Sequence, residues 1–104
     1  MKKVNEKDVP FKHGKSGSKY LFNEQKFSGG VAYLDPGDEI KLHGHDDETE
    51  IFYFVKGAPV FMSGDNEIRV AQGDSYLVPS GEKHGIKNDT GAVVQMTFLK
   101  IKEK

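Results

Sequence analysis

The strongest constraint on the fold is the way turn residues divide the chain into short apolar runs. Twelve glycines and four prolines are spread over 104 residues, and they separate β-branched and aromatic segments that are too short for ordinary helices. Many short strands at close spacing indicate a single all-β domain, a sandwich or barrel. The predicted strands are 29–34, 39–43, 50–55, 58–62, 67–71, 75–79, 84–87 and 93–101.

The segment FMSGDNEIRV (61–70) predicts a tight hairpin within this set of strands. Gly64 and Asp65 or Asn66 are expected at its turn, because these residue types tolerate the positive φ that short hairpins require.

The strand at 50–55 is apolar on both faces. Alternation places Phe52 and Phe54 on one face and Ile51, Tyr53 and Val55 on the other. A strand that is apolar on both sides is expected to be covered on both sides. The covering layer is either a second sheet of the same chain or another subunit, and the pattern favours a homodimer.

Composition excludes several classes of function. The chain has no cysteine, so it has no disulfide, thiolate metal site or cysteine nucleophile. No apolar run is long enough for a signal peptide or a membrane span, and the net charge of −1 gives no general attraction to nucleic acid or membrane. We therefore expect a cytoplasmic protein without nucleic-acid or membrane partners.

The positive charge is concentrated at the amino end. Residues 1–19 contain six lysines and two acidic residues, whereas residues 20–104 carry an acidic excess. We interpret residues 1–19 as a basic, partly flexible arm and residues 20–104 as the barrel domain.

Histidines and acids meet at the start of the apolar strand 50–55. His43 and His45 share a strand parity, so neutral imidazoles could bind a divalent metal from one side. Glu50 shares the core-facing parity of Phe52, and a carboxylate there is costly unless a charge or metal pairs with it. His84, after a turn, is a further candidate on pattern alone.

Other polar residues near this segment have simpler interpretations. Asp46, Asp47 and Glu48 fall in a predicted turn, where acids are usually solvated. His13 lies in the basic arm and is expected to be exposed.

Two motifs account for the histidines and Glu50 together. Residues 37–57 read GDEIKLHGHDDETEIFYFVKG, a glycine, five residues, His-x-His, four residues, a glutamate, six residues and a glycine. Residues 73–88 read GDSYLVPSGEKHGIKN, a glycine, five residues, Pro-x-Gly, two residues, a histidine, three residues and an asparagine. Fifteen residues separate the two motifs. This arrangement resembles the two conserved motifs of the cupin superfamily at every defining position.

The resemblance implies a double-stranded β-helix, or jelly-roll barrel, with one divalent transition metal ion. By the match to the motifs, the metal ligands would be His43, His45, Glu50 and His84. This donor set suits Fe, Mn, Ni, Cu or Zn and leaves coordination positions open to a small-molecule ligand or substrate.

The resemblance implies either of two functions. One is a metal-dependent enzyme, dioxygenase- or isomerase-like, acting on a small molecule in the barrel. The other is a non-catalytic module that binds a metal and a small ligand. Both stay open because a fold shared by many activities does not identify the substrate. No catalytic residue beyond the metal ligands is assigned.

The barrel lining can be predicted from strand parity. The candidate lining residues, each interpreted first as core, are Phe52, Phe54, Met62, Tyr76, Met96 and Phe98. Tyr33, Tyr53 and Tyr76 are candidates to donate a phenol hydroxyl to a bound ligand.

Overall fold

The chain was analysed as a computed structural model that describes residues 1–103. A short 3₁₀ helix, η1 (Glu6–Asp8), precedes nine strands. The strands are β1 (Gly17–Asn23), β2 (Phe27–Leu34), β3 (Glu39–His43), β4 (Glu48–Lys56), β5 (Val60–Ser63), β6 (Asn66–Arg69), β7 (Ser75–Val78), β8 (His84–Lys87) and β9 (Val94–Lys102). No helix in the described chain is long and apolar enough to cross a membrane.

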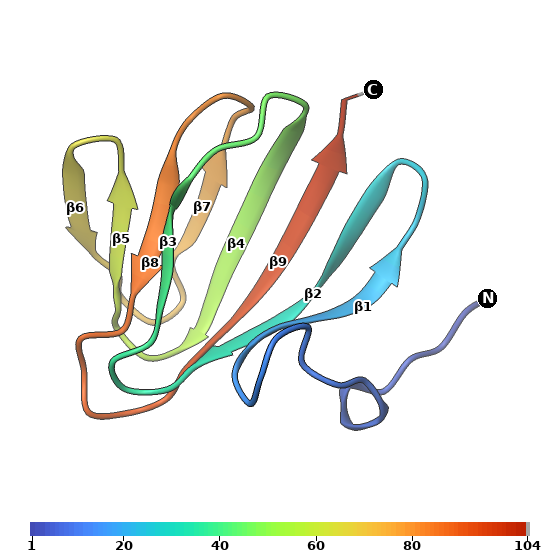
Figure 1. Cartoon of the computed structure of the whole chain (residues 1–104), viewed down its shortest axis with the longest axis horizontal. Helices are drawn as coiled ribbons and strands as arrows, with labels where there is room; N and C mark the ends of the chain where they lie inside the picture. Colours follow the sequence, from blue (N-terminus) through green and yellow to red (C-terminus); the bar gives the residue numbers. More distant parts are fainter. Residues whose placement is uncertain (104) are drawn as a thin grey trace.

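The strands form two antiparallel sheets that face each other (Figure 1). One sheet has the order β1-β2-β9-β4-β7 and the other β3-β8-β5-β6. Consecutive strands alternate between the sheets along much of the chain, which is the winding of a jelly roll. Hydrogen bonding within residues 1–103 does not join the sheets into a closed barrel, so they form a two-sheet sandwich.

The eight predicted strands all occur, two of them with the predicted ends and the others with ends shifted by at most two residues. The hairpin prediction is confirmed, because β5 and β6 pair antiparallel around Gly64, which has a φ of 58°. Strand β1 was not predicted. It pairs with β2 where Gly30 lets the backbones approach, since a Cβ on Gly30 would lie only 2.9 Å from Leu21 N.

The predicted boundary between arm and barrel, after residue 19, falls inside β1. Residues upstream of β1 contact the five-stranded sheet. Tyr33 Oη donates to Glu6 Oε1 at 2.6 Å, Lys19 Nζ donates to the Glu6 carbonyl at 3.0 Å, and the Phe11 ring meets Tyr33 edge-on. The flexibility of the arm stays a prediction.

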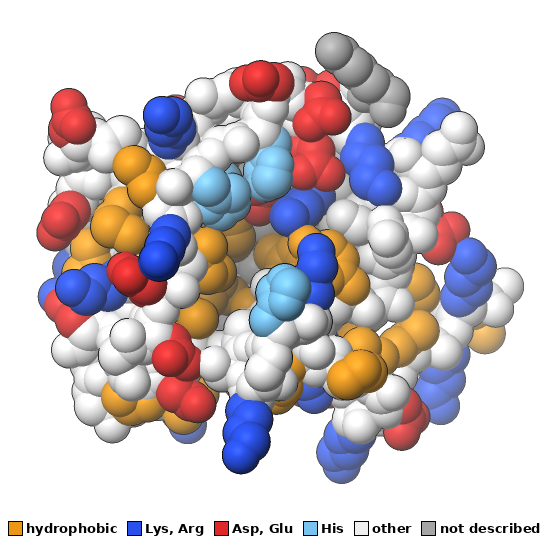
Figure 2. Space-filling model, in the orientation of Figure 1, with side chains coloured by type: hydrophobic (Ala, Val, Ile, Leu, Met, Phe, Trp, Pro, Cys, Tyr) orange, Lys and Arg blue, Asp and Glu red, His pale blue; other side chains and the backbone are white. Residues whose placement is uncertain are grey.

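The core lies between the two sheets, where side chains of alternating residues point inward. The even-numbered residues from 50 to 54 in β4 and from 94 to 98 in β9 are buried, in agreement with period-two alternation. In the space-filling view the face shown is hollowed near its centre, with hydrophobic side chains on the floor and histidines at the rim (Figure 2). The buried hydrophobic residues are Ala32, Leu34, Phe52, Phe54, Phe61, Val70, Val78, Ile86, Val94, Met96 and Phe98.

The outer face of the five-stranded sheet is apolar but uncovered. Tyr53 and Val55 of β4 are 46% and 37% exposed, and Leu77 of β7 is 64% exposed. The four-stranded sheet packs only on the inner face. The prediction that a second sheet of the same chain covers the outer face is therefore wrong.

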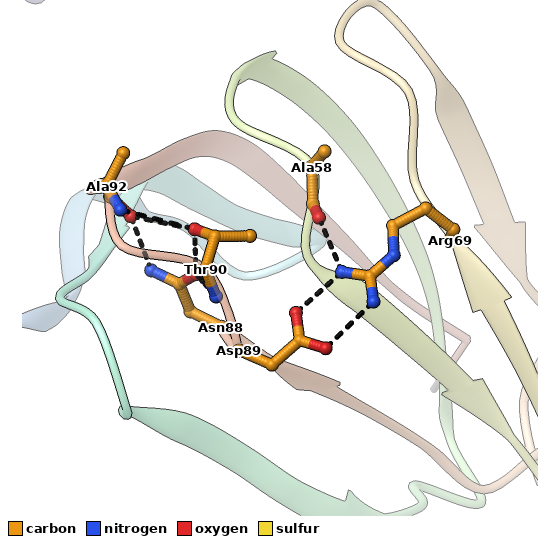
Figure 3. A network of polar contacts seen from close by, with 6 residues as sticks. All are labelled: Ala58, Arg69, Asn88, Asp89, Thr90 and Ala92. Carbon is orange, nitrogen blue, oxygen red and sulfur yellow. Dashed lines mark hydrogen bonds and ion pairs between the residues drawn. The ribbon is translucent and has the colours of Figure 1, made fainter.

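Asn88, which follows β8, links the end of β2 to the loop between β8 and β9, and Figure 3 shows its contacts within that loop. Its side-chain nitrogen donates to the carbonyls of Leu34 and Ala92 at 2.9 and 2.8 Å. Its side-chain oxygen accepts from the backbone N–H and hydroxyl of Thr90. Asn88 is completely buried, so its side chain satisfies backbone groups that the loops leave unpaired. The asparagine at the end of the second motif therefore has a structural role in this chain.

Arg69, the single arginine, holds the neighbouring loops. Its guanidinium forms a bidentate pair with Asp89 at 2.6 and 2.8 Å and donates to the Ala58 carbonyl (Figure 3). The pair holds the pKa of Asp89 below its ordinary value. The arginine is therefore engaged in the fold and is not available for ligand binding.

Candidate metal centre

Strands β3 and β8 place two histidines directly opposite each other. His43, the last residue of β3, pairs in register with His84, the first residue of β8, and their ring centroids lie 4.5 Å apart. The register shifts between Ile40 and His43. Gly85 permits this close pairing, because an added Cβ would lie 2.7 Å from the Ile40 carbonyl oxygen.

Glu50 comes from the facing sheet. It belongs to β4, is 3% exposed and lies on the same inward face as Phe52. The core-facing position predicted for Glu50 is therefore confirmed. Its Oε1 lies 3.4 Å from His84 Nε2 and 3.5 Å from His45 Nε2.

His45 lies beyond the end of β3, not within the strand as parity assumed. It still lies beside His43, with ring centroids 5.1 Å apart. The fold thus brings together all four residues that the motifs indicated. One ligand atom from each of His43, Glu50 and His84 lies within 4.8 Å of the others.

Backbone carbonyls orient two of the imidazoles. His43 Nδ1 donates to the Lys41 carbonyl at 2.8 Å, and the Glu82 carbonyl lies 3.3 Å from His84 Nδ1. A carbonyl can only accept, so each of these Nδ1 atoms carries a proton, and Nε2 is the nitrogen whose lone pair a metal would bind in the neutral ring. This is the arrangement that orients histidine ligands in metal sites.

Three buried polar atoms face one another without hydrogen-bond partners in the described chain: His45 Nε2, Glu50 Oε1 and His84 Nε2. Unpaired buried polar atoms are rare and costly. Two donors bound about 2.1 Å from one ion, at roughly 90° to 110°, would lie about 3.0–3.4 Å apart, close to the distances from Glu50. The residues therefore fit a transition metal ion.

Sequence and structure comparisons agree with this site. A family model described as "Cupin domain" matches residues 30–100, which include both motifs. The chain belongs to the cupin family. This match confirms the cupin family that was predicted from the two motifs, together with the predicted jelly-roll fold.

One curated relative of this cupin is an oxalate-binding protein from Thermotoga maritima. It is 38% identical over 55 residues, which are 53% of this chain and 46% of the relative. The match thus spans about half the length of that relative.

Solved structures share the fold over nearly the whole chain. A protein described as a predicted oxalate decarboxylase from Thermotoga maritima superposes with a TM-score of 0.82 and 23% identity, covering 97% of this cupin and 99% of that chain. A double-stranded β-helix protein from Klebsiella pneumoniae superposes with a TM-score of 0.84 and 14% identity, over 100% and 92% of the two chains. At these identities the likeness supports the fold alone.

The electrostatic environment of Glu50 favours a carboxylate. Burial raises the pKa of Glu50, but the neighbouring His84 and the positive charges of Lys100 and His45 lower it more, so the net pKa is below the ordinary value. A deprotonated Glu50 is the form that can bind a metal.

A small cavity of about 70 Å³ adjoins the cluster. His43, Glu50 and Phe52 line it, and Met96 and Phe98 form part of its apolar wall. The other predicted lining residues lie elsewhere. Phe54 is completely buried and the ring of Tyr76 stacks on Phe61, while Met62 lies against Gly85.

The three tyrosines proposed as hydroxyl donors do not line this cavity. Tyr33 donates to Glu6, Tyr53 lies on the outer face, and Tyr76 donates to Asp74 at 3.4 Å. Tyr20 of the unpredicted strand β1 lines the cavity instead, as does Lys100 of β9.

Sequence reasoning missed Lys100, although a usable signal was present. On β9, Lys100 follows Met96 and Phe98 at the same parity, so it is a charged residue at a core-facing position, as Glu50 is. Burial lowers the pKa of Lys100, but the Tyr20 hydroxyl and the carboxylates of Glu50 and Glu48 raise it more, giving a net upward direction. Lys100 is therefore a cation at neutral pH.

The turn acids and His13, which were predicted to be solvated, differ in their exposure. Asp46, Asp47 and His13 are exposed, as predicted. Glu48 is the exception, because it begins β4 with a side chain only 16% exposed and places Oε1 3.7 Å from His45 Nδ1. Glu48 lies on the side of His45 that faces away from Glu50.

Proposed function

We propose that this cupin binds one divalent transition metal ion through His43, His45, Glu50 and His84, and that it acts on a small molecule in the adjoining cavity. The observation that carries the proposal is the convergence of buried, unpartnered His45 Nε2, Glu50 Oε1 and His84 Nε2. A metal would compensate the cost of burying these atoms. Fe, Mn, Ni, Cu and Zn are all compatible with three nitrogens and one carboxylate.

The chain's own groups would prepare the site for a ligand. When bound, the ion would supply Lewis acidity and open coordination positions. The Lys41 and Glu82 carbonyls contact Nδ1 of two imidazoles, which leaves Nε2 as the nitrogen that faces the proposed ion. Phe52 and Phe61 flank the His84 ring, with centroids 5.5 and 6.3 Å from it. These apolar rings limit the access of water and fix the ring orientation.

A second candidate function is ligand binding without turnover. It is favoured by the relative described as an oxalate-binding protein, and the same open positions would serve a bidentate oxygen ligand. Oxygen consumption and isomerase assays on metal-loaded protein distinguish the two functions. Turnover supports the enzyme, whereas saturable binding with no turnover across metals and substrates supports the binder.

The test of the metal proposal is elemental analysis of untagged protein purified without chelators, beside a His84→Ala variant. We expect close to one transition metal ion per wild-type chain and strong loss in the variant, because His84 is 2% exposed and faces Glu50. A wild-type protein that retains none of the five ions after incubation with each would overturn the proposal.

A homodimer through the outer face of the five-stranded sheet is a further part of this proposal. Support comes from the exposed apolar side chains on β4, β7 and β9, which include Leu77, Leu99 and Ile101. Adjacent exposed apolar residues on a sheet face often mark an interface, and a symmetric dimer would cover one such face with another copy. A cytoplasmic location also stays a prediction.

We expect the Leu77→Glu substitution to convert the dimer into a monomer, because it would place a charge inside the apolar interface. Light scattering coupled to size-exclusion chromatography measures the mass. Val4→Glu, at another exposed apolar residue, is the matched control and should leave the dimer intact. A monomeric wild type, or a dimer unaffected by Leu77→Glu, would contradict the interface.

A further inference from the structure

Lys100 occupies the point where the apolar inner face of β9 meets the candidate metal centre. Met96 and Phe98 precede it on the same face and are buried. Its register partner on β4 is Glu50. An ammonium group at such a position costs free energy unless it interacts with an acceptor.

Lys100 separates two cavities. It lines the small cavity of about 70 Å³ together with His43 and Glu50. It also lines a larger, open cavity of about 640 Å³, whose wall includes Val9 to Lys12 of the amino-terminal segment. A ligand entering from the larger cavity toward Glu50 would therefore pass Lys100. The small cavity holds about as much space as two waters in the liquid, taking roughly 30 Å³ each, so only a few atoms of the ligand would fit there.

The ammonium group of Lys100 has more N–H donors than hydrogen-bonded acceptors around it in the described chain. Its Nζ donates to the hydroxyl of Tyr20 at 2.8 Å, and none of the ion pairs among residues 1–103 involves it. An ammonium carries three donors. Lys102, two residues along the same face, differs because its Nζ donates to Asn23 Oδ1 and to the Glu24 carbonyl.

We propose that Lys100, positioned by Tyr20, is the anion-binding residue of this cavity and that it selects carboxylate ligands. The inference rests on the proposed metal site, because the ligand's other oxygen donor would take an open position on the ion. A divalent ion and the ammonium group of Lys100 carry more positive charge than the carboxylates of Glu50 and the nearby Glu48 can balance. An anionic ligand balances this excess, whereas a neutral ligand leaves it uncompensated.

The experiment uses calorimetry to measure the binding of oxalate to metal-loaded protein from which the unbound metal ions have been removed. The variants are Lys100→Met, which keeps the length of the apolar stem, and Lys100→Gln, which keeps hydrogen-bonding capacity without the charge. We expect both to retain the metal and the wild-type unfolding temperature, and to weaken oxalate binding roughly 10- to 100-fold, the range for losing a hydrogen bond to a charged group. Lys102→Met, on the same face, should change binding by less than about 3-fold.

The outcomes separate this inference from the proposed function. Equal oxalate affinity in wild type and both Lys100 variants overturns the role of Lys100 even if every protein retains its metal. If the wild type retains no metal, the proposed function fails, and the same titrations on metal-free protein then decide on Lys100 alone. Weaker oxalate binding in the Lys100 variants than in the wild type supports the anion site. Equal binding in the wild type and the Lys100 variants overturns it. Equal losses in Lys100→Met and Lys102→Met also overturn it.

Discussion

Replacing Glu50 by glutamine is expected to lower the affinity of the protein for its metal ion by more than roughly 100-fold. Outer partners of a metal site cost about 10- to 100-fold when they are mutated, and Glu50 is proposed as a direct ligand. Its Oε1 lies 3.4–3.5 Å from Nε2 of both His84 and His45 and has no hydrogen-bond partner in the described chain. Glutamine has a similar shape, so the substitution removes the charge without opening a cavity.

The measurement is competition with a chelating dye, together with elemental analysis of the purified variant. Glu48→Gln is the matched control, because it makes the same chemical change two residues earlier on the same strand. Glu48 Oε1 lies 3.7 Å from His45 Nδ1, which is longer than a hydrogen bond, so its replacement should cost at most about tenfold, the low end of the range for outer partners. Equal losses in the two variants, or wild-type affinity in Glu50→Gln, would show that Glu50 is not the carboxylate ligand.

Asn88→Ala is expected to reduce the free energy of unfolding by about 3 kcal/mol. The substitution removes the hydrogen bonds to Leu34, Thr90 and Ala92 from a completely buried position. Each buried group left without a partner costs about 1–3 kcal/mol. For a domain of this size, a loss of about 3 kcal/mol lowers the unfolding midpoint by roughly 12–24 °C.

Urea and thermal unfolding followed by circular dichroism measure this loss. Asn66→Ala makes the same change at an exposed position beside the β5–β6 turn, and it should alter stability by less than about 0.5 kcal/mol. A loss below about 1 kcal/mol for Asn88→Ala would mean that water or rearranged loops satisfy the freed carbonyls, and that Asn88 does not hold the end of β8.

Several features of this cupin could be predicted from the sequence because they depend on neighbours along the chain. Turn residues set the strand boundaries to within two residues, and Gly64 fixed the β5–β6 hairpin. Alternation placed Glu50 on the inward face with Phe52. These features follow from the period of a strand and the backbone freedom of glycine, which operate over a few residues. The two motifs added His84, which pattern alone left undecided.

Other features depended on the tertiary structure because they join distant parts of the chain. Strand β1 has seven residues, and its position follows from pairing with β2. The contact between Tyr20 and Lys100 joins residues 80 positions apart, so strand parity could place Lys100 on an inward face but could not predict its hydroxyl partner. The sequence by itself determined an all-β chain with an inward glutamate and two histidine motifs. The tertiary structure decided which hydroxyl and which ammonium group face that glutamate, because the packing of two sheets selects their neighbours.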